Sequence, residues 1–381
     1  ARRDTSLYLY YVLIAVAALV FYLLPKKGQV PWLVLVSLFV FATWDLYFVL
    51  VLLGLSALFY GMGIVIDRQE DRKKKTTLVR VGVFAGVIAL AFFKYNAQLF
   101  AQTGMVWALA APVGISYYTF QGISYLKDLQ AMKLSAERNP FRFLLYTAFF
   151  PKLSAGPIER AKDFLIQFED KIRFEYETFL AGLFRMMWGM FKKVMLVNRL
   201  VVVTKLVYAD PRQFNGLQLL IGLLLSAFYI YFDFSSYMDL AIGAANVFGI
   251  RLSENFQQPY FATSIIDFWR RWHITFSSWL RDYLFIPLNF QSRRVRKPWM
   301  QPINVMLTFL VSGIWHGTTL NFILWGGYHG ALQVLELRRE ARRKRLGKQP
   351  LPPTGWRTRG KVIGTFLLVS AGWVLFFSNS M

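Results

Sequence analysis

Long apolar runs with few charges constrain this chain more than any other feature. Two of them, Leu7 to Leu24 and Leu217 to Phe232, approach the roughly 20 residues that a helix needs to cross the hydrocarbon core of a bilayer. Hydrophobic residues make up 56% of the chain and charged residues only 17%, and the mean hydropathy is +0.38. This balance is far from that of a soluble globular domain. The sequence therefore predicts an all-α polytopic membrane protein.

The formal net charge of +23 would raise the question of nucleic acid in a soluble protein. Here the cations gather in short connections beside apolar runs, as in cytoplasmic loops under the positive-inside rule. We interpret the charge as topology, expect contact with membrane lipids and no nucleic-acid partner, and expect three segments to face the cytoplasm. These segments are Asp67 to Lys75, Gln291 to Lys297 and Arg338 to Lys348.

Apolar segments separated by polar connections predict roughly ten helices, some too short or too interrupted to cross a membrane fully. The predicted spans are Leu7 to Leu24, Pro31 to Ile66 with an interruption near Asp45, Val81 to Phe93, Met105 to Leu126, Phe141 to Leu153, Phe179 to Val203, Leu217 to Ile250, Ile265 to Leu288, Val305 to Tyr328 and Val362 to Phe377.

Proline and glycine concentrate in two segments, Ala111 to Gly114 and Pro151 to Pro157. Proline removes a backbone donor, and broken backbone at membrane depth is tolerated only where it lines a cavity or packs inside protein. These segments are either re-entrant elements around an interior chamber or interfacial loops, and the pattern favours neither.

The segment Ile265 to Leu280 begins with a helix start of the Ser-x-x-Asp type at Ser264 and Asp267. A helix from there places aromatic side chains on one face and arginines on the other, which is typical of a helix lying in the membrane interface. The tryptophans and arginines could anchor this helix at the level of the lipid headgroups. Alternatively, the guanidinium groups of the arginines bind the phosphates of a nucleotide-type donor molecule. The aromatic face has Ile265, Phe268, Trp269, Trp272, Phe276 and Trp279, and the opposite face has Arg270, Arg271, Ser277, Ser278 and Arg281, with His273 on the boundary.

The chain has three histidines and no cysteine. An ionisable group at membrane depth is costly, so each histidine is a candidate functional residue. His316 lies inside the predicted span Val305 to Tyr328, with Gly313 and Gly317 permitting close helix approach. A neutral imidazole there can take a proton from an attacking hydroxyl and return it to a leaving group. The alternative is a histidine whose hydrogen bonds are satisfied in the core.

Other polar groups in apolar segments are weaker candidates for functional residues. On a continuous helix His329 would lie about 20 Å from His316, which favours a structural or acceptor-side role unless the intervening glycines fold it back. Asp233 and Asp239 are six residues apart and do not form a carboxylate pair, so we expect them to pair with an arginine or histidine or to cap a helix. The histidine spacing gives no support for a metal site, and none is predicted.

An ordered set of motifs resembles the membrane-bound O-acyltransferase family. The matching stretches are 112–125, 149–160, 231–237 and 255–260, followed by the strongest, Phe268-Trp269-Arg270-Arg271-Trp272-His273, Trp279-Leu280-Arg281-Asp282-Tyr283 and Gly313-Ile314-Trp315-His316-Gly317. The set is most similar to the bacterial branch that contains alginate O-acetyltransferase, peptidoglycan O-acetyltransferases and the D-alanyl transferase of teichoic acids. Alginate-type members often continue the Arg-Asp-Tyr motif into a glycine-rich loop, and this chain does not.

The resemblance implies a helical funnel through a bacterial inner membrane, with His316 at the constriction and His273 near the donor side as catalytic residues. It implies a cytoplasmic thioester donor, acetyl-CoA or a carrier-protein thioester, and no bound cofactor. Expected partners are an extracytoplasmic SGNH-hydrolase-like acyltransferase, a glycan acceptor and a donor protein in the cytoplasm. The expected donor-binding residues are Arg270, Arg271, Arg281 and Trp269, and the expected funnel-lining or supporting residues are Gln121, Pro151, Lys152, Asp233, Ser236, Trp315, Asn321 and His329.

The predicted organisation follows from this match. We expect N-terminal transmembrane helices over residues 1–100, the catalytic core over 101–337, a basic cytoplasmic loop over 338–361 and a C-terminal transmembrane helix over 362–381. The predicted activity is O-acylation of an extracytoplasmic polysaccharide or cell-wall glycan with a small acyl group, most simply acetyl. Two alternatives stay open, D-alanyl transfer to teichoic acid and a proton-coupled transporter, although the matched repeats typical of many transporters are not found.

Overall fold

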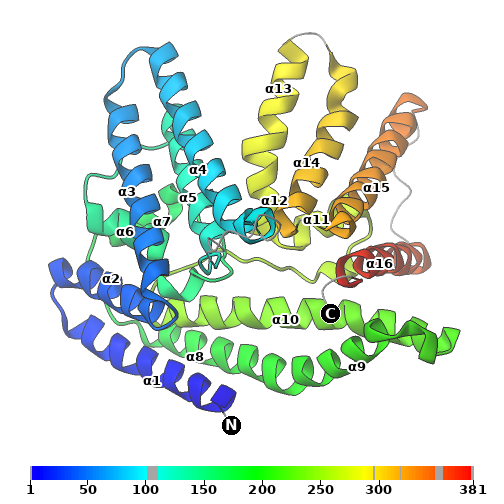
Figure 1. Cartoon of the computed structure of the whole chain (residues 1–381), viewed down its shortest axis with the longest axis horizontal. Helices are drawn as coiled ribbons and strands as arrows, with labels where there is room; N and C mark the ends of the chain where they lie inside the picture. Colours follow the sequence, from blue (N-terminus) through cyan, green and yellow to red (C-terminus); the bar gives the residue numbers. More distant parts are fainter. Residues whose placement is uncertain (1, 101–109, 295–296, 318, 348–354, 379–381) are drawn as a thin grey trace. The chain divides into compact units, whose positions relative to one another are not determined.

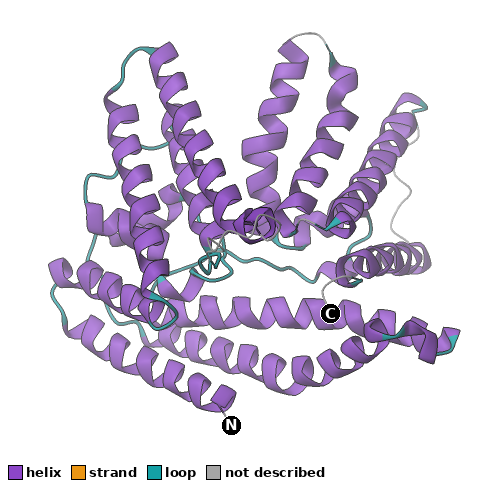
Figure 2. Ribbon diagram, viewed as in Figure 1, coloured by secondary structure: helices purple, strands orange, loops and turns teal. Residues whose placement is uncertain are grey.

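The computed structural model describes residues 2–100, 110–294, 297–317, 319–347 and 355–378, and in these ranges the regular structure is helical (Figures 1 and 2). A single isolated bridge joins Phe256 to Trp272. The predicted all-α class is confirmed. Four helices within the described ranges are long and apolar enough to cross a membrane, namely Leu46–Arg68, Arg72–Asn96, Gly216–Val247 and Gly355–Phe377.

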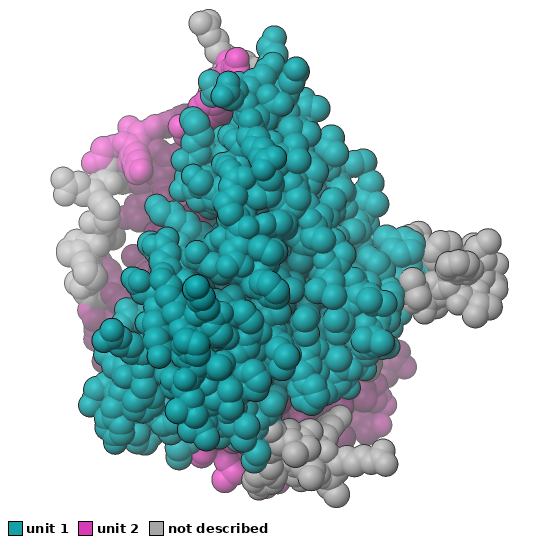
Figure 3. All heavy atoms as spheres, turned by 90° about the vertical axis from the view of Figure 1, so that its left-hand side faces the viewer, with its two compact units in different colours: residues 1–189, 237–253 teal, residues 190–236, 254–381 magenta. Residues whose placement is uncertain are grey.

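The chain divides into two compact units (Figure 3). Unit 1 comprises Ala1–Gly189 and Tyr237–Ser253, and unit 2 comprises Met190–Ser236 and Glu254–Met381. Helix α10 (Gly216–Val247) contributes its first part to unit 2 and its last part to unit 1.

Unit 1 contains the N-terminal helices. They are α1 (Arg2–Leu23), α2 (Lys26–Ala42), α3 (Leu46–Arg68), α4 (Arg72–Phe100), α5 (Ile115–Gln130), α6 (Pro140–Ala148), α7 (Ala161–Leu165) and α8 (Tyr176–Phe191). The predicted interruption near Asp45 is confirmed, because its side chain caps α3 by accepting a hydrogen bond from the backbone N–H of Tyr47 (2.9 Å). The first basic connection is short, since only residues 69–71 separate α3 from α4.

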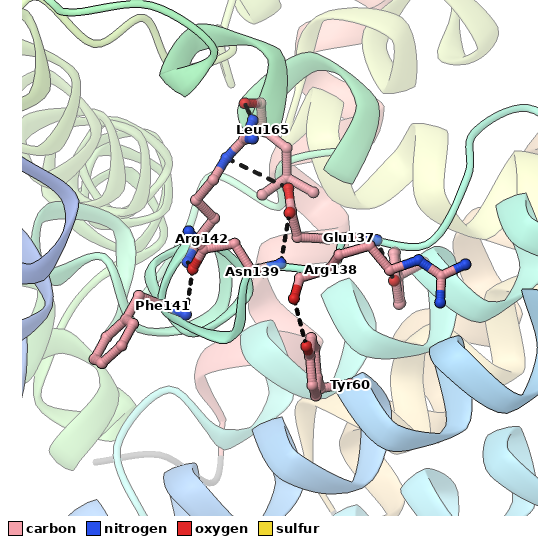
Figure 4. Close-up of polar contacts among 8 residues, drawn as sticks. Tyr60, Glu137, Arg138, Asn139, Phe141, Arg142 and Leu165 are labelled. Carbon is pink, nitrogen blue, oxygen red and sulfur yellow. Dashed lines mark hydrogen bonds and ion pairs between the residues drawn. The ribbon is translucent and has the colours of Figure 1, made fainter. Parts of the chain in front are cut away.

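The start of α6 is fixed by a small polar network in unit 1 (Figure 4). The side chain of Asn139 accepts hydrogen bonds from the backbone N–H groups of Phe141 (2.9 Å) and Arg142 (3.3 Å). Arg142 in turn pairs with Glu137 (3.4 Å) and donates to the carbonyl of Leu165 (2.7 Å). The network satisfies free N–H groups of α6 and ties this helix to α7.

The two segments rich in proline and glycine pack against each other inside unit 1. Gly114 has a positive φ of 73°, and a Cβ at this position would lie 1.9 Å from the carbonyl oxygen of Leu153. Only glycine fits both the conformation and the contact. Pro151, Lys152 and Leu153 are buried. The two segments therefore contact each other inside unit 1.

Unit 2 contains the C-terminal helices. They are α9 (Asn198–Ala209), α11 (Ile265–Arg271), α12 (Ile274–Leu280), α13 (Ile286–Arg294), α14 (Gln301–His316), α15 (Leu320–Arg345) and α16 (Gly355–Phe377). Helices α14 and α15 form an antiparallel hairpin (Figure 1). A Cβ at Gly313 would lie 2.3 Å from the carbonyl of Phe322, so the predicted close helix approach is confirmed there.

Two predicted continuous helices are wrong. The segment Val305 to Tyr328 is divided between α14 and α15, because the chain turns after His316. The segment Ile265 to Leu280 is divided into two seven-residue helices by an extended Trp272 and a left-handed His273. The Ser-x-x-Asp start of α11 is confirmed, since the Ser264 hydroxyl accepts a hydrogen bond from the N–H of Asp267 (3.0 Å).

The basic ends of unit 2 lie together. Figure 1 shows α13 and α15 ending at the same end of this unit, which brings Arg293 and Arg294 to the same side as Arg342 to Arg345. The segment expected as a basic loop is helical as far as Arg345, and the last helix begins at Gly355 rather than Val362. Part of the predicted span Met105 to Leu126 lies outside the described residues, and α5 begins at Ile115.

Candidate functional site

All three histidines lie in unit 2 and share aromatic neighbours. The indole ring of Trp325 lies 5.0 Å from the ring of His316 and 5.1 Å from that of His329. The ring of Phe276 lies 5.0 Å from His273 and 6.2 Å from His316. The fold therefore gathers the three candidate residues in one aromatic cluster.

His316 is the last residue of α14, at the turn of the hairpin, and not deep within a continuous span as the sequence suggested. Its imidazole is half-buried. Rings from four helices surround it at centroid distances between 4.5 and 6.2 Å. These rings belong to Phe276, Trp315, Phe322, Trp325 and Phe376. They restrict the orientation of the imidazole while leaving it partly accessible.

His273 lies between α11 and α12 in an unusual backbone conformation, with φ of 45°. Two backbone hydrogen bonds hold this turn, from Gln257 N–H to the carbonyl of Arg271 (3.0 Å) and from Ile274 N–H to the carbonyl of Asn255 (3.0 Å). A left-handed conformation is uncommon for a residue with a side chain and persists only where the surroundings enforce it. The helical pattern predicted His273 at the boundary of a helix face, but the turn places it in the interior.

Asn255 orients the His273 ring. Its Oδ1 lies 3.2 Å from Nδ1 of His273 and also accepts hydrogen bonds from the N–H (3.0 Å) and hydroxyl (2.9 Å) of Thr275. Because this oxygen only accepts, Nδ1 of His273 carries the proton and Nε2 has the lone pair. Nε2 has no hydrogen-bond partner among the described residues. Burial lowers the pKa of His273 to about 3, so the ring is neutral at pH 7.

His329 is fully buried on α15, and neither ring nitrogen has a hydrogen-bond partner in the part of the chain that the structure describes. Its ring lies 5.2 Å from Trp269 and 6.2 Å from Trp373. The sequence placed His329 far from His316 on a continuous helix, whereas the hairpin folds α15 back so that Trp325, one turn before His329, contacts His316. The chain turns between the end of α14 at His316 and the start of α15 at Leu320, and Gly326 and Gly327 are helical.

A cavity of about 530 Å³ lies within unit 2. Two of its lining residues contact histidines, Trp269 with His329 and Phe276 with His273. Its volume is in the range of small-molecule sites. It is lined by Ile266, Trp269, Arg270, Ile274, Phe276, Ser277, Ser278, Leu280, Arg281, Phe285, Gln301, Val305, Thr308, Phe309, Ser312, Gln333 and Leu337.

Three of the four residues expected to bind the donor line this cavity, namely Trp269, Arg270 and Arg281. The indole N–H of Trp269 is buried without a hydrogen-bond partner in the described ranges. Arg271 does not line the cavity, and its Nε donates to Oδ1 of Asp267 (2.8 Å), one turn earlier on α11. The structure thus separates neighbouring arginines that the sequence grouped together.

Phe276 connects the cavity to the histidines. Its ring lines the cavity and lies 4.2 Å from that of Trp315, which itself lies 4.5 Å from His316. His316 is one helical turn beyond Ser312, the cavity residue nearest to it along α14. Ring contacts through Phe276 and Trp315 therefore link the cavity to the imidazole.

The candidates Gln121, Pro151 and Lys152 lie in unit 1. Lys152 is buried, donates to the carbonyl of Tyr146 (2.5 Å) and lies over the ring of Phe164 at 4.7 Å. Burial lowers the pKa of Lys152 to about 7, although Glu159 nearby favours its charged form. Because Tyr146 is in the last turn of α6, the lysine caps the end of this helix.

The remaining supporting candidates have local partners. Lys193 donates to Asp233 (2.6 Å), Arg185 to Asp239 (3.1 Å) and the Ser236 hydroxyl to the carbonyl of Asp233 (2.8 Å). Pairing of Asp239 with an arginine is as predicted, whereas Asp233 pairs with a lysine. Asn321 donates to the hydroxyl of Ser378 (2.9 Å). Among the described residues, no group of three or more metal-binding side chains could hold an ion.

Sequence reasoning missed several residues of this site. Asn255 carried a signal, as an amide between apolar motifs, but its partner 18 residues away could not be read from spacing. Trp325 gave no signal beyond its apolar context. The contacts of Phe376 and Gly372 come from α16, where the sequence offered no motif.

Comparison with known proteins shows the family to which the chain belongs. The model of the membrane-bound O-acyltransferase family matches residues 18–339. The chain is 33% identical over 383 residues to the probable alginate O-acetylase AlgI of Pseudomonas aeruginosa, covering 95% of this chain and 69% of the relative. It is also 33% identical to the peptidoglycan O-acetyltransferase of Helicobacter pylori, over 92% of this chain and 71% of the relative. The teichoic acid D-alanyltransferase of Bacillus subtilis is 30% identical to this chain, over 69% of this chain and 68% of the relative.

Proposed function

Because the chain belongs to the membrane-bound O-acyltransferase family, we propose that this acyltransferase passes an acetyl group from acetyl-CoA across the membrane to an acceptor hydroxyl, for O-acetylation of an extracytoplasmic polysaccharide or cell-wall glycan. Two of the relatives reported above have names that specify O-acetylation, of alginate and of peptidoglycan. The proposed location is the inner membrane of a bacterium, where the protein crosses the bilayer several times.

One observation carries the proposal. The cavity in unit 2 has Arg270 and Arg281 on its wall, and Phe276 links it to His316 through aromatic contacts. Arginines suit the phosphates of a nucleotide-type donor, and an apolar cavity of this volume suits the narrow arm that carries a thioester. The basic ends of α13 and α15 lie on one side of the unit, as expected for a donor that enters from the cytoplasm.

In this proposal His316 acts as the general base. Its neutral imidazole takes the proton of the acceptor hydroxyl while the hydroxyl oxygen attacks the thioester carbonyl carbon. The tetrahedral intermediate then collapses, the carbon–sulfur bond breaks, and the imidazolium returns the proton to the departing thiolate. The five rings around His316 hold it in one orientation for both transfers.

The other residues assist. His273, neutral and with a free Nε2, is available to accept a hydrogen bond on the donor side. Trp315 orients His316, and the buried groups Gln121, Pro151 and Lys152 support the fold of unit 1. No bound cofactor is needed, since the thioester supplies the activated acyl group. An extracytoplasmic SGNH-hydrolase-like acyltransferase is the proposed partner that completes delivery to the glycan.

The test compares cells that express wild-type protein, His316→Ala or neither. Mass spectrometry of the cell-wall and secreted glycans identifies the acyl group and its acceptor together. We expect glycan O-acetyl groups with wild-type protein and a loss of about 10² to 10⁴ in the rate of acetyl transfer with His316→Ala. Equal protein in the membrane and equal melting temperature in detergent serve as controls. Near-normal acetylation by His316→Ala would refute the assigned role.

The teichoic acid D-alanyltransferase relative supports a second candidate, transfer of D-alanine from a carrier-protein thioester. The same mass spectrometry separates the two, because D-alanyl and acetyl esters add different masses to the glycan. Release of free thiol from acetyl-CoA by membranes that contain the protein provides the second criterion, since a D-alanyl transferase would leave this donor intact.

A further inference from the structure

The C-terminal helix α16 lies beyond residue 339, where the family match ends, and yet it reaches the site. Phe376 presents its ring edge-on to His316 at a centroid distance of 5.2 Å. The same ring lies 5.1 Å from Phe322, on the first turn of α15. Phe376 therefore contacts both the imidazole and a ring in the first turn of α15.

One turn earlier on the same face, Gly372 brings α16 directly against His329. A Cβ at Gly372 would lie 2.6 Å from Nε2 of His329, closer than real Cβ contacts allow. His329 is fully buried, so its ring cannot move out into solvent. By contrast, a Cβ at Gly364 of the same helix would meet no atom within 4 Å. The requirement for glycine on α16 is thus specific to the contact with His329.

The contact at Gly372 is connected to His316 through stacked rings. Trp373 lies nearly parallel to Trp325, with an interplanar angle of 22° and centroids 6.1 Å apart. Trp325 touches both His329 and His316. Two hydrogen bonds tie α16 to α15 at separate points, from Tyr328 to the carbonyl of Leu368 (2.9 Å) and from Asn321 to Ser378 (2.9 Å).

We infer that α16 positions the catalytic imidazole, with Phe376 fixing the ring of His316 directly and Gly372 setting the depth at which α16 packs on His329 and Trp325. The inference rests on the proposed function of His316. Close-packed interiors transmit displacements rather than absorbing them, so a shift of α16 reaches His316 through these rings. A displacement of about 1 Å at a catalytic group can cost roughly 10²-fold in rate.

The experiment measures free thiol released from acetyl-CoA by membranes that contain each variant, over a range of acetyl-CoA concentrations. The variants are Phe376→Ala, Phe376→Leu and Gly372→Ala. Gly364→Ala is the matched control for the glycine, and Val374→Ala, an exposed position on α16, is the control for the phenylalanine. Melting temperature in detergent gives the folded fraction of each.

We expect Phe376→Ala and Gly372→Ala to lower kcat by about 10- to 100-fold per folded molecule, with KM for acetyl-CoA within twofold of wild type. Phe376→Leu, which keeps apolar bulk against the ring, should recover part of the loss, and both controls should behave as wild type. If Gly372→Ala does not fold, the two Phe376 variants decide the question.

The inference is overturned if His316→Ala is inactive while Phe376→Ala and Gly372→Ala keep kcat within twofold of their controls. A loss of activity that only follows the folded fraction also overturns it, because it indicates a structural role alone. If His316→Ala itself remains active, the proposed function fails first, so the two failures are distinguishable.

Discussion

The amide oxygen of Asn255 lies 3.2 Å from Nδ1 of His273, and this contact joins two motifs that are 18 residues apart. The same oxygen holds the start of α12 through Thr275. One buried side chain therefore fixes the backbone turn, the orientation of the ring and its tautomer. The free Nε2 of His273 is a consequence of this arrangement.

Asn255→Ala should reduce both stability and activity. Loss of the shared acceptor leaves buried donors of Thr275 and His273 unsatisfied, which costs about 1–3 kcal/mol in the free energy of unfolding. The His273 ring is then free to change tautomer, so acetyl transfer per folded molecule should fall. Asn304→Ala is the control, since Asn304 is also buried in unit 2 and donates to Asn289 (3.0 Å) and Ser292 (3.1 Å). Equal activity losses in the two variants would argue against a special role for Asn255.

Between pH 3 and 6.5 the melting temperature should depend on the protonation of His273. Burial lowers the pKa of this ring to about 3 from an ordinary value of 6.5. In this window the folded protein binds fewer protons at His273 than the unfolded chain does, so stability falls as the pH decreases and is unaffected above pH 6.5. His273→Gln should show a shallower acid dependence than wild type. An identical slope in both proteins would exclude the contribution.

Neighbouring arginines on α11 should respond differently to substitution. Arg270→Gln and Arg281→Gln should each raise KM for acetyl-CoA by roughly ten- to hundred-fold, the effect of losing a hydrogen bond to a charged group. Arg271→Gln is the matched control, because Arg271 pairs with Asp267 outside the cavity. Its substitution should cost at most about 1 kcal/mol in stability and leave KM unchanged. A larger KM effect at Arg271 than at Arg270 would contradict the placement of the donor.

Ser312→Leu should block the cavity. Ser312 is a buried cavity residue on α14, one turn before His316. A leucine there fills part of the cavity, so activity should fall at least tenfold with little change in the amount of protein in the membrane, because overpacking costs about 1–3 kcal/mol. Val311→Leu, on the exposed side of the helix, is the control. Full activity in Ser312→Leu would show that the donor does not use this cavity.

Lys152→Met should make the stability of the protein less dependent on pH. Burial lowers the pKa of Lys152 to about 7 from 10.5, so between these values the folded protein binds fewer protons than the unfolded chain. Stability then rises with pH above 7 in wild type, and this rise should be smaller in the variant. The carbonyl of Tyr146 also loses its donor, at a cost of about 1–3 kcal/mol. Lys162→Met, at an exposed position, should match wild type in melting temperature at pH 7 to 9.5.

The start of α11 at Ser264 and the interruption at Asp45 could be predicted because helix capping depends on residues a few positions apart. The partners of Asn255 and the separation of Arg270 from Arg271 could not, since both depend on where the chain turns. The turn at His273 is held by backbone hydrogen bonds to residues 255–257, and no local pattern around His273 indicates it.

By itself, the sequence determined the class of fold, the membrane setting, the family and the three histidines as candidates, because hydropathy and motif order are properties of the linear chain. Only the tertiary structure decided which of these side chains meet. The hairpin after His316 folds α15 back so that Trp325 meets His316, and α16 brings Phe376 to His316 from 60 positions further along the chain. Packing of distant apolar faces fixes such contacts, and it depends on the shapes of all the helices together rather than on the residues near any one of them.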